Sequence, residues 1–218
     1  MNVNSPKNNI VDFYGRGFVV TKDVLIPRPE TEMIVDTVLD FAGKSYLPGV
    51  KPKASVLPNN CKILDVGTGS GCIAIMLKLE LPEAQITASD ISEPALKVAR
   101  ENAARLGAEV EFIKSDLLEE IPGDFDVAVA NLPYVDKDWD WIDKKTLAKE
   151  PSIALYAENH GLALIYRLID QVAKRKVPRL ILEADPCQHQ DVINYAKNRN
   201  YQLEETRGFI ISLSSLQV

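Results

Sequence analysis

The stretch Ile63-Leu-Asp-Val-Gly-Thr-Gly-Ser-Gly-Cys72 joins a short apolar run to a helical pattern through a turn with three closely spaced glycines. Glycines in such a turn let the backbone bend sharply and pass close to a ligand where a side chain would not fit. No Gly-Lys-Ser/Thr sequence follows, so the turn does not match the P-loop of ATP-binding proteins. Cys72 stands where a dinucleotide fingerprint needs its third glycine, which disfavours NAD as the ligand.

Short β-branched runs alternate with longer helical patterns outward from this turn. This alternation predicts an α/β fold with a parallel sheet covered by helices. The predicted strands are Lys62–Val66, Gln85–Ser89, Val110–Lys114, Asp126–Ala130 and Arg179–Glu183, and the predicted helices are Cys72–Leu81, Pro94–Leu106, Gly161–Lys174 and Gln188–Arg199. Two further strands, Tyr201–Glu205 and Phe209–Ser214, are joined by a turn at Gly208 and predict an antiparallel hairpin at the sheet edge.

The residues before the sheet predict two smaller elements and a linker. Val11–Tyr14 and Phe18–Thr21 flank Gly15-Arg-Gly17 like a hairpin, and an amphipathic helix opened by Pro29 runs through Phe41. Residues 43–60 hold three prolines and two glycines, which is typical of a linker. We therefore expect one compact domain, in which residues 1–42 pack on the core, residues 43–60 link and residues 61–218 form the core.

Composition and charge narrow the classes of function. A net charge of −6 and a pI near 5.1 argue against a protein that binds nucleic acid mainly by neutralising phosphates, although local basic patches remain compatible with it. The three cysteines share no metal-ligand spacing and there are only two histidines, so we expect no metal site. The sequence shows neither a signal peptide nor a membrane-spanning run, which predicts a cytoplasmic protein without a membrane partner.

Carboxylates follow two of the predicted strands, at the edge where an α/β sheet binds its ligands. Asp90 is placed to accept hydrogen bonds from both hydroxyls of a ribose, or alternatively to cap the next helix. Asp116 is placed to reach an adenine edge, or alternatively to cap a helix or turn. The compact glycine turn suits a ligand without a pyrophosphate, so this set favours S-adenosylmethionine as the cofactor. A glycine turn in some other α/β fold remains the alternative.

A second motif, Asn131-Leu-Pro-Tyr134, directly follows the predicted strand Asp126–Ala130. An amide or aryl amine nitrogen is a poor nucleophile because its lone pair is delocalised, so a transferase must hold its hydrogens and aim the lone pair at the methyl group. The Asn131 side-chain oxygen and the Leu132 carbonyl can each accept one N–H, and Pro133 fixes the chain without adding a donor. Tyr134 offers a flat face to the substrate or the sulfonium. The two motifs together predict an N-methyltransferase that works by positioning and electrostatics.

These motifs resemble those of the HemK/PrmC family of protein-glutamine methyltransferases. The resemblance runs over Val24-Leu-Ile-Pro-Arg-Pro-Glu-Thr-Glu32, Ile63–Ile75, Ala88–Ser92, Asn131–Tyr134, Glu150-Pro151 with Ala154-Leu155, and Gly161-Leu162. It implies a class I, Rossmann-like fold with a mostly parallel seven-stranded sheet and an antiparallel C-terminal strand. It also implies methylation of the glutamine in the Gly-Gly-Gln motif of peptide chain release factors.

The resemblance implies roles for single residues as well. Cofactor contacts are expected from Asp65, Gly67, Thr68, Gly69, Ser70, Gly71, Asp90, Asp116, Leu117 and Asn131, and the acceptor glutamine is expected at Asn131, Leu132, Pro133 and Tyr134. Arg28 either shapes the substrate mouth or forms an ion pair with Glu30 or Glu32. Trp139 and Trp141 either form a lid over the substrate or pack against the domain.

The sequence departs from the family pattern in three places. Leu132 replaces the first proline of the usual Asn-Pro-Pro-Tyr, and Asn-Leu-Pro-Tyr resembles the clamp of adenine dimethyltransferases that act on ribosomal RNA. The sequence begins at the small hairpin, without the helical N-terminal domain of typical members, and the usual glycine pair before Gly161 is missing. An N6-adenine methyltransferase acting on RNA or DNA is therefore the alternative function, because both acceptor nitrogens are planar and conjugated. A cofactor-binding subunit without activity is a third reading, which the intact glycines and Asn131 oppose.

Overall fold

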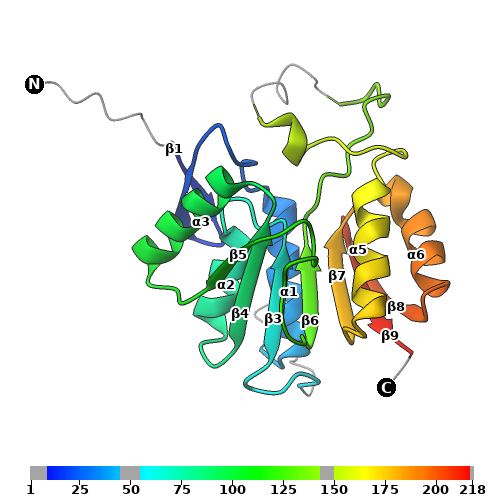
Figure 1. Ribbon diagram of the computed structural model, residues 1–218, viewed down its shortest axis with the longest axis horizontal. Helices are drawn as coiled ribbons and strands as arrows, with labels where there is room; N and C mark the ends of the chain where they lie inside the picture. Colours follow the sequence, from blue (N-terminus) through cyan, green and yellow to red (C-terminus); the bar gives the residue numbers. More distant parts are fainter. Residues whose placement is uncertain (1–8, 45–54, 143–149, 217–218) are drawn as a thin grey trace, which may run out of the picture.

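The structure is a computed structural model that describes residues 9–44, 55–142 and 150–216, so the predicted linker 43–60 lies partly outside the described residues. The strands of its main sheet are β3 (Lys62–Val66), β4 (Gln85–Asp90), β5 (Glu111–Lys114), β6 (Val127–Ala130), β7 (Arg179–Glu183), β8 (Tyr201–Arg207) and β9 (Ile210–Ser215). They follow the order β5-β4-β3-β6-β7-β9-β8, and β9 alone among them runs in the opposite direction to the others (Figure 1). The predicted α/β fold with a mostly parallel sheet is therefore confirmed.

Helices cover both faces of this sheet (Figure 1). One face carries α1 (Glu32–Phe41), α2 (Cys72–Glu80) and α3 (Glu93–Leu106), and the other carries α5 (Ala163–Lys174) and α6 (His189–Lys197). In the described part of the chain, three short 3₁₀-helices precede α1, α5 and α6, namely η1 (Pro29–Thr31), η2 (Ser152–Ala154) and η3 (Pro186–Gln188). Within the described ranges, none of the helices has the length and apolar character needed to span a bilayer.

The central strand β3 shows why the sequences of these strands are almost continuously apolar. Its side chains alternate between the faces, so Ile63 lies in the core under α1 and α2, whereas Leu64 and Val66 lie in the core under α5 and α6. Because both faces of the parallel sheet are buried, residues on both sides of the strand are apolar. Polar groups that act on a ligand must then gather at the carboxyl ends of the strands.

Beyond residue 60 the predicted elements begin and end within two residues of the observed ones. The helix α5 begins at Ala163 rather than at the predicted Gly161, because Gly161 has φ +82° and cannot belong to a right-handed helix. Pro29–Thr31 forms the 3₁₀-helix η1, so α1 begins only at Glu32.

The N-terminal hairpin pairs β1 (Asn9–Phe13) with β2 (Arg16–Val20) through a two-residue turn. Both turn residues have positive φ, 54° for Tyr14 and 71° for Gly15, as a tight hairpin of this hand requires. The turn therefore lies one residue before the predicted Gly15-Arg-Gly17. The tyrosine is held in this conformation because its backbone N–H donates to Glu32 (2.7 Å) and its hydroxyl to Asp36 (2.8 Å), both in α1.

Asn102 in α3 docks this hairpin onto the main domain. Its side chain is fully buried and pairs with the backbone of Val19 as a neighbouring strand would, accepting from the N–H at 2.8 Å and donating to the carbonyl at 2.9 Å. Its amide also donates to the carbonyl of Ser70 at 2.9 Å. One side chain thus joins β2, α3 and the glycine turn.

We expect Asn102→Ala to lower the free energy of unfolding by about 2–4 kcal/mol, because it leaves several buried backbone groups without partners. Denaturant unfolding measures this. The control is Asn194→Ala, which removes an asparagine from the exposed side of α6 and should change stability by no more than about 0.5 kcal/mol. Equal effects of the two substitutions would contradict the docking role.

Candidate functional site

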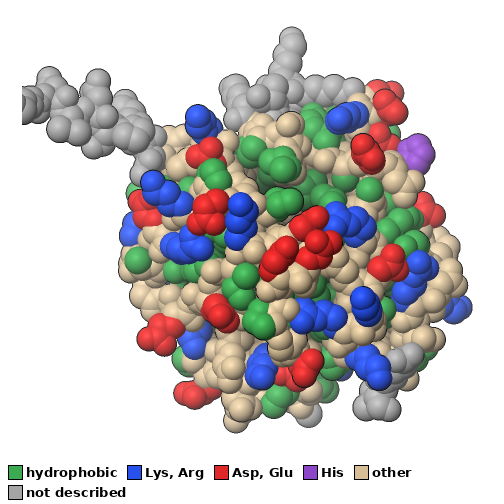
Figure 2. Space-filling model, in the orientation of Figure 1, with side chains coloured by type: hydrophobic (Ala, Val, Ile, Leu, Met, Phe, Trp, Pro, Cys, Tyr) green, Lys and Arg blue, Asp and Glu red, His purple; other side chains and the backbone are tan. Residues whose placement is uncertain are grey.

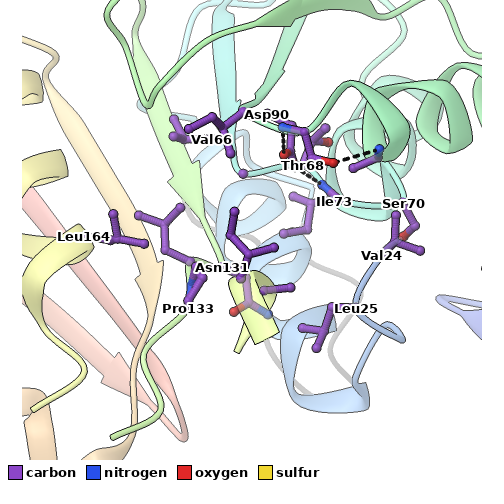
Figure 3. A pocket seen from close by; sticks show the side chains of 18 of the residues that line it. Val24, Leu25, Val66, Thr68, Ser70, Ile73, Asp90, Asn131, Pro133 and Leu164 are labelled. Atoms are coloured by element: carbon purple, nitrogen blue, oxygen red, sulfur yellow. Dashed lines mark hydrogen bonds between the residues drawn. The ribbon is translucent and has the colours of Figure 1, made fainter. Parts of the chain in front are cut away.

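A cavity of about 250 Å³ lies at the carboxyl ends of β3, β4 and β6. This is the edge where open α/β sheets bind their ligands. Figure 2 shows apolar side chains gathered around a hollow at this end of the molecule, and Figure 3 shows Leu164 on one side of the pocket with Val24 and Leu25 on the other. The walls come from the N-terminal segment (Asp23, Val24, Leu25, Pro27, Thr31), the glycine turn (66–70, 72 and 73), the strand ends (90–92, 115–117 and 131–133), and Ala95, Ile153, Ala154, Leu164 and Arg167.

Most of the predicted cofactor residues line this cavity. They are Gly67, Thr68, Gly69, Ser70, Asp90, Asp116, Leu117 and Asn131. The predicted Asp65 and Gly71 are not part of its wall. The sequence therefore identified one side of the cavity, whereas the wall formed by residues 23–31 was not predicted.

The glycine turn has the shape of a cradle. Gly67, Gly69 and Gly71 all have positive φ, 75°, 55° and 82°. A Cβ on Gly67 would lie 2.8 Å from Leu132, and one on Gly71 would lie 3.0 Å from Ala99, so these positions need glycine for close packing. No described atom lies within 4 Å of a Cβ built on Gly69, so the cavity side of the turn is open to a ligand.

Asp65 lies behind this turn and supports it. Its carboxylate accepts hydrogen bonds from the hydroxyl of Thr68 (2.7 Å) and the N–H of Ala74 (3.2 Å). Burial raises the pKa of Asp65 to about 7, against the lowering effect of these bonds. None of the described residues donates a hydrogen bond to its other oxygen, Oδ1. Its first role is therefore to hold the turn.

Asp90 connects the turn to the start of α3. One carboxylate oxygen accepts from the N–H of Gly69 (2.9 Å) and the other from the N–H of Ser92 (2.8 Å). Each carboxylate oxygen has a second lone pair, so Asp90 can also accept a hydroxyl from the cavity. Burial raises the pKa of Asp90, while these backbone bonds favour the ionised form. Ser92 caps α3 by accepting from Ala95, so the capping role considered for Asp90 is filled.

The next strand end adds a strained residue to the wall. Leu117 has φ +53°, which is unfavourable for a side chain of this size, and its carbonyl accepts from the hydroxyl of Ser115 at 2.8 Å. Asp116 accepts from Arg167 of α5 at 2.9 Å. Arg167 lines the cavity and was not predicted, because nothing in its local sequence distinguishes it from other exposed arginines.

The residues Asn131 to Tyr134 separate this cavity from a second one of about 260 Å³. Both cavities are lined by Leu25, Asn131, Leu132, Pro133 and Ala154. Tyr134 lines only the second. Ligands in the two cavities would therefore meet beside Asn131.

A hydrogen-bond network holds the polar groups of Asn131–Tyr134, the segment that the sequence predicts to hold the acceptor and that is called the clamp below. The Asn131 amide donates to the hydroxyl of Thr31 (2.9 Å), and Thr31 donates to Glu183 at the end of β7 (2.7 Å). The hydroxyl of Tyr134 donates to the other oxygen of Glu183 at 2.9 Å. Thr31 lies inside a motif that the sequence singled out, whereas Glu183 was noted only as the end of a strand.

Gly161 allows a second support of the clamp. The buried amide of Gln188 donates to the carbonyls of Tyr134 and His160, both at 2.8 Å. A Cβ on Gly161 would lie 1.9 Å from the Tyr134 carbonyl oxygen and 2.7 Å from Nε2 of Gln188. Only glycine fits beside this bond.

The structure answers the question about Arg28, and it places the two tryptophans without deciding between their two predicted roles. Arg28 forms an ion pair with Glu150, which also accepts from the N–H of Ile26 at 3.0 Å. An ion pair was among the predicted roles of Arg28, but the predicted partners, Glu30 or Glu32, were wrong. The rings of Trp139 and Trp141 stack with their centres 5.0 Å apart and line the second cavity.

Comparisons with known proteins identify the family to which this chain is similar. Residues 36–147, just over half of it, match the methyltransferase small domain family. The release factor glutamine methyltransferase of Koribacter versatilis (strain Ellin345) is 44% identical over 170 residues, covering 77% of this chain and 56% of that protein. The bifunctional methyltransferase of Rickettsia bellii (strain RML369-C) is 37% identical over 238 aligned positions, covering 95% of this chain and 42% of that protein. The chain thus spans about half the length of the curated relatives it matches.

A solved structure supports the fold. The T. thermophilus 16S rRNA N2 G1207 methyltransferase, in complex with AdoMet and guanosine, has a TM-score of 0.65 at 12% identity, covering 96% of this chain and 50% of that chain. The predicted class I fold is thereby confirmed.

We expect Gly161→Ala to lower the free energy of unfolding by about 1–3 kcal/mol more than Gly123→Ala does. Both glycines have nearly the same φ, +82° and +79°, but no described atom lies within 4 Å of a Cβ on Gly123. The difference between the two variants in thermal or denaturant unfolding isolates the contact with the clamp. Equal losses of unfolding free energy in the two variants would show that the structure around Gly161 adjusts to the added methyl group without further destabilisation.

Proposed function

The chain belongs to the methyltransferase small domain family, and within it to the HemK/PrmC group, so we propose that it transfers a methyl group from S-adenosylmethionine to the side-chain amide nitrogen of a protein glutamine. The acceptor is the glutamine in the Gly-Gly-Gln motif of a peptide chain release factor, and the reaction takes place in the cytoplasm. The observation that carries the proposal is the meeting of the two cavities beside Asn131.

The cavity on the glycine turn supports S-adenosylmethionine as the cofactor. Its wall is open at Gly69, where the turn lets a ligand approach the backbone, and Asp90 keeps lone pairs for ribose hydroxyls. Apolar side chains from both sides of the cavity, such as Val24 and Leu164, suit the flat adenine and the uncharged parts of the cofactor (Figure 3). When bound, the cofactor supplies an electrophilic methyl group on a positively charged sulfur.

The clamp supports an amide nitrogen as the acceptor. The Asn131 amide donates to Thr31, so its oxygen is left to accept one hydrogen of the acceptor NH₂. The carbonyl of Leu132 is the proposed second acceptor. Held in this way, the nitrogen presents its lone pair to the methyl group without a strong base, and alignment supplies much of the rate.

The charge of the molecule favours a protein acceptor over the alternative of adenine in RNA or DNA. The net charge is −6. Arg175, from the most basic stretch of the sequence, donates to the carbonyls of Leu118, Ile121 and Gly123, so its guanidinium is engaged within the protein. Both observations support a protein acceptor, because nucleic-acid affinity depends largely on phosphate contacts made by free cations.

We expect one methyl group on the Gly-Gly-Gln glutamine after a purified release factor is incubated with this chain and S-adenosylmethionine. Fragment mass spectrometry locates the methyl group, and a release factor with alanine in place of that glutamine is the control. If calorimetry shows cofactor binding but the glutamine stays unmodified, the proposed acceptor is wrong and RNA becomes the next substrate to test.

Two substitutions should separate cofactor binding from transfer. Asn131→Ala should lower kcat about 100-fold or more, because it removes the group that orients the acceptor, and should leave cofactor affinity nearly unchanged. Asp90→Asn should instead weaken cofactor binding about tenfold through the loss of charged hydrogen bonds. Calorimetry and single-turnover transfer measure the two effects. Unchanged turnover by Asn131→Ala would refute the clamp.

A further inference from the structure

Two buried residues behind Asn131 have no role in the proposed function so far. Thr31 ends η1 and Glu183 ends β7, and each is only 2% exposed. The hydroxyl of Thr31 accepts a hydrogen from Nδ2 of Asn131 (2.9 Å) and donates its own to Oε2 of Glu183 (2.7 Å). Thr31 also lines the first cavity and Glu183 the second, so Asn131, Thr31 and Glu183 form a continuous relay of hydrogen bonds beside the point where the two cavities meet.

The relay has a fixed direction when Glu183 is ionised. A carboxylate has no hydrogen to donate, so the single hydroxyl proton of Thr31 must point to Glu183. The hydroxyl then offers only lone pairs to Asn131, and the amide must turn its NH₂ toward Thr31. The two ends of an amide are almost identical in shape, so packing alone does not choose between them.

We propose that Thr31 and Glu183 are positioning residues that hold the Asn131 amide with its oxygen toward the methyl acceptor. The proposal rests on the proposed function, in which that oxygen accepts a hydrogen of the glutamine NH₂. A reversed amide would present its own N–H groups to the N–H groups of the acceptor, and the hydrogen bond that aims the lone pair would be lost.

The surroundings of Glu183 determine when the relay works. Burial raises the pKa of Glu183, and nearby Glu30 raises it further, whereas the hydrogen bonds from Thr31 and Tyr134 and the charge of Arg28 lower it. Tyr134 remains a donor, since burial and then the charge of Glu183 raise the pKa of its phenol well above the usual range. Once Glu183 is protonated at acid pH, it can donate to Thr31, and the direction of the relay is no longer fixed.

The first test removes the hydroxyl in the middle of the relay. Thr31→Val keeps the shape of the side chain and should lower kcat for release factor methylation roughly 10- to 100-fold with cofactor affinity unchanged, and Thr31→Ser should restore most of the rate. Thr37→Val is the matched control, because Thr37 is also buried but donates only to the carbonyl of Met33 within α1. A wild-type kcat in Thr31→Val, or an equal loss in Thr37→Val, would overturn the proposal.

The second test uses pH. The rate of the wild-type protein should fall as pH drops below the raised pKa of Glu183, which gives the pH profile an acid limb. Glu183→Gln and Thr31→Val should both be slow, and their pH profiles should lack this acid limb. Since the folded-state pKa is raised above the unfolded value, ionisation of this carboxylate opposes folding, and Glu183→Gln should not lower the melting temperature at a pH above the raised pKa. A variant that loses stability while keeping the rate and the acid limb would show that Glu183 is only structural.

The third measurement needs no methyl acceptor. The side-chain NH₂ of Asn131 is identified in ¹⁵N–¹H spectra as the signal that Asn131→Asp removes. This signal should shift in Thr31→Val, stay in Thr37→Val, and titrate with Glu183 only when Thr31 is present. If no release factor is methylated but these shifts occur, the proposed function fails and the relay stands. If the Asn131 signal does not change in Thr31→Val, the relay is wrong, whether or not the protein methylates a release factor.

Discussion

Burial of both faces of a parallel sheet is the constraint on which this structure depends. A strand such as β3 is covered by helices on each side, so its polar neighbours can reach solvent or a ligand only at the end of the strand. Asp90, Asn131 and Glu183 end or follow three of these strands, and each is brought to the same edge. The chemistry of the site follows from this convergence, because side chains far apart in sequence become hydrogen-bond partners there.

The sequence predicted the parts of the molecule that local patterns encode. Strands and helices after residue 60 were predicted almost completely, because β-branched runs, the Ser92 cap and Gly107 are local signals. The glycine turn and the clamp motif were predicted for the same reason. The partner of Arg28 was missed, because Glu150 lies 122 residues away and the nearer Glu30 and Glu32 looked equally suitable. A pair of residues so far apart in sequence produces no local pattern from which the contact could be predicted.

The N-terminal segment is part of the site and not an appendage to it. Val24 and Leu25 form one side of the cavity, Arg28 ties the segment to the residues before η2, and Asn102 fastens the hairpin to the back of the glycine turn. The Ile-Pro-Arg-Pro-Glu-Thr-Glu motif of this segment holds two residues that make long-range contacts, Arg28 and Thr31. Its prolines favour an extended backbone at Ile26 and Arg28, and from this segment Arg28 reaches Glu150 before η2 and Thr31 reaches Glu183 at the end of β7.

The spacing of these partners along the chain has a consequence for synthesis on the ribosome. Gly69 and Asp90 are 21 residues apart, whereas Thr31 and Glu183 are 152 residues apart. At roughly 5–20 residues per second, about 8–30 s pass between the emergence of the threonine and that of its carboxylate. The hydrogen bond between Gly69 and Asp90 can therefore form early, whereas Asn131 gains the support of Thr31 and Glu183 only when β7 joins the sheet. During synthesis, the local contacts of the glycine turn thus precede the long-range contacts around Asn131.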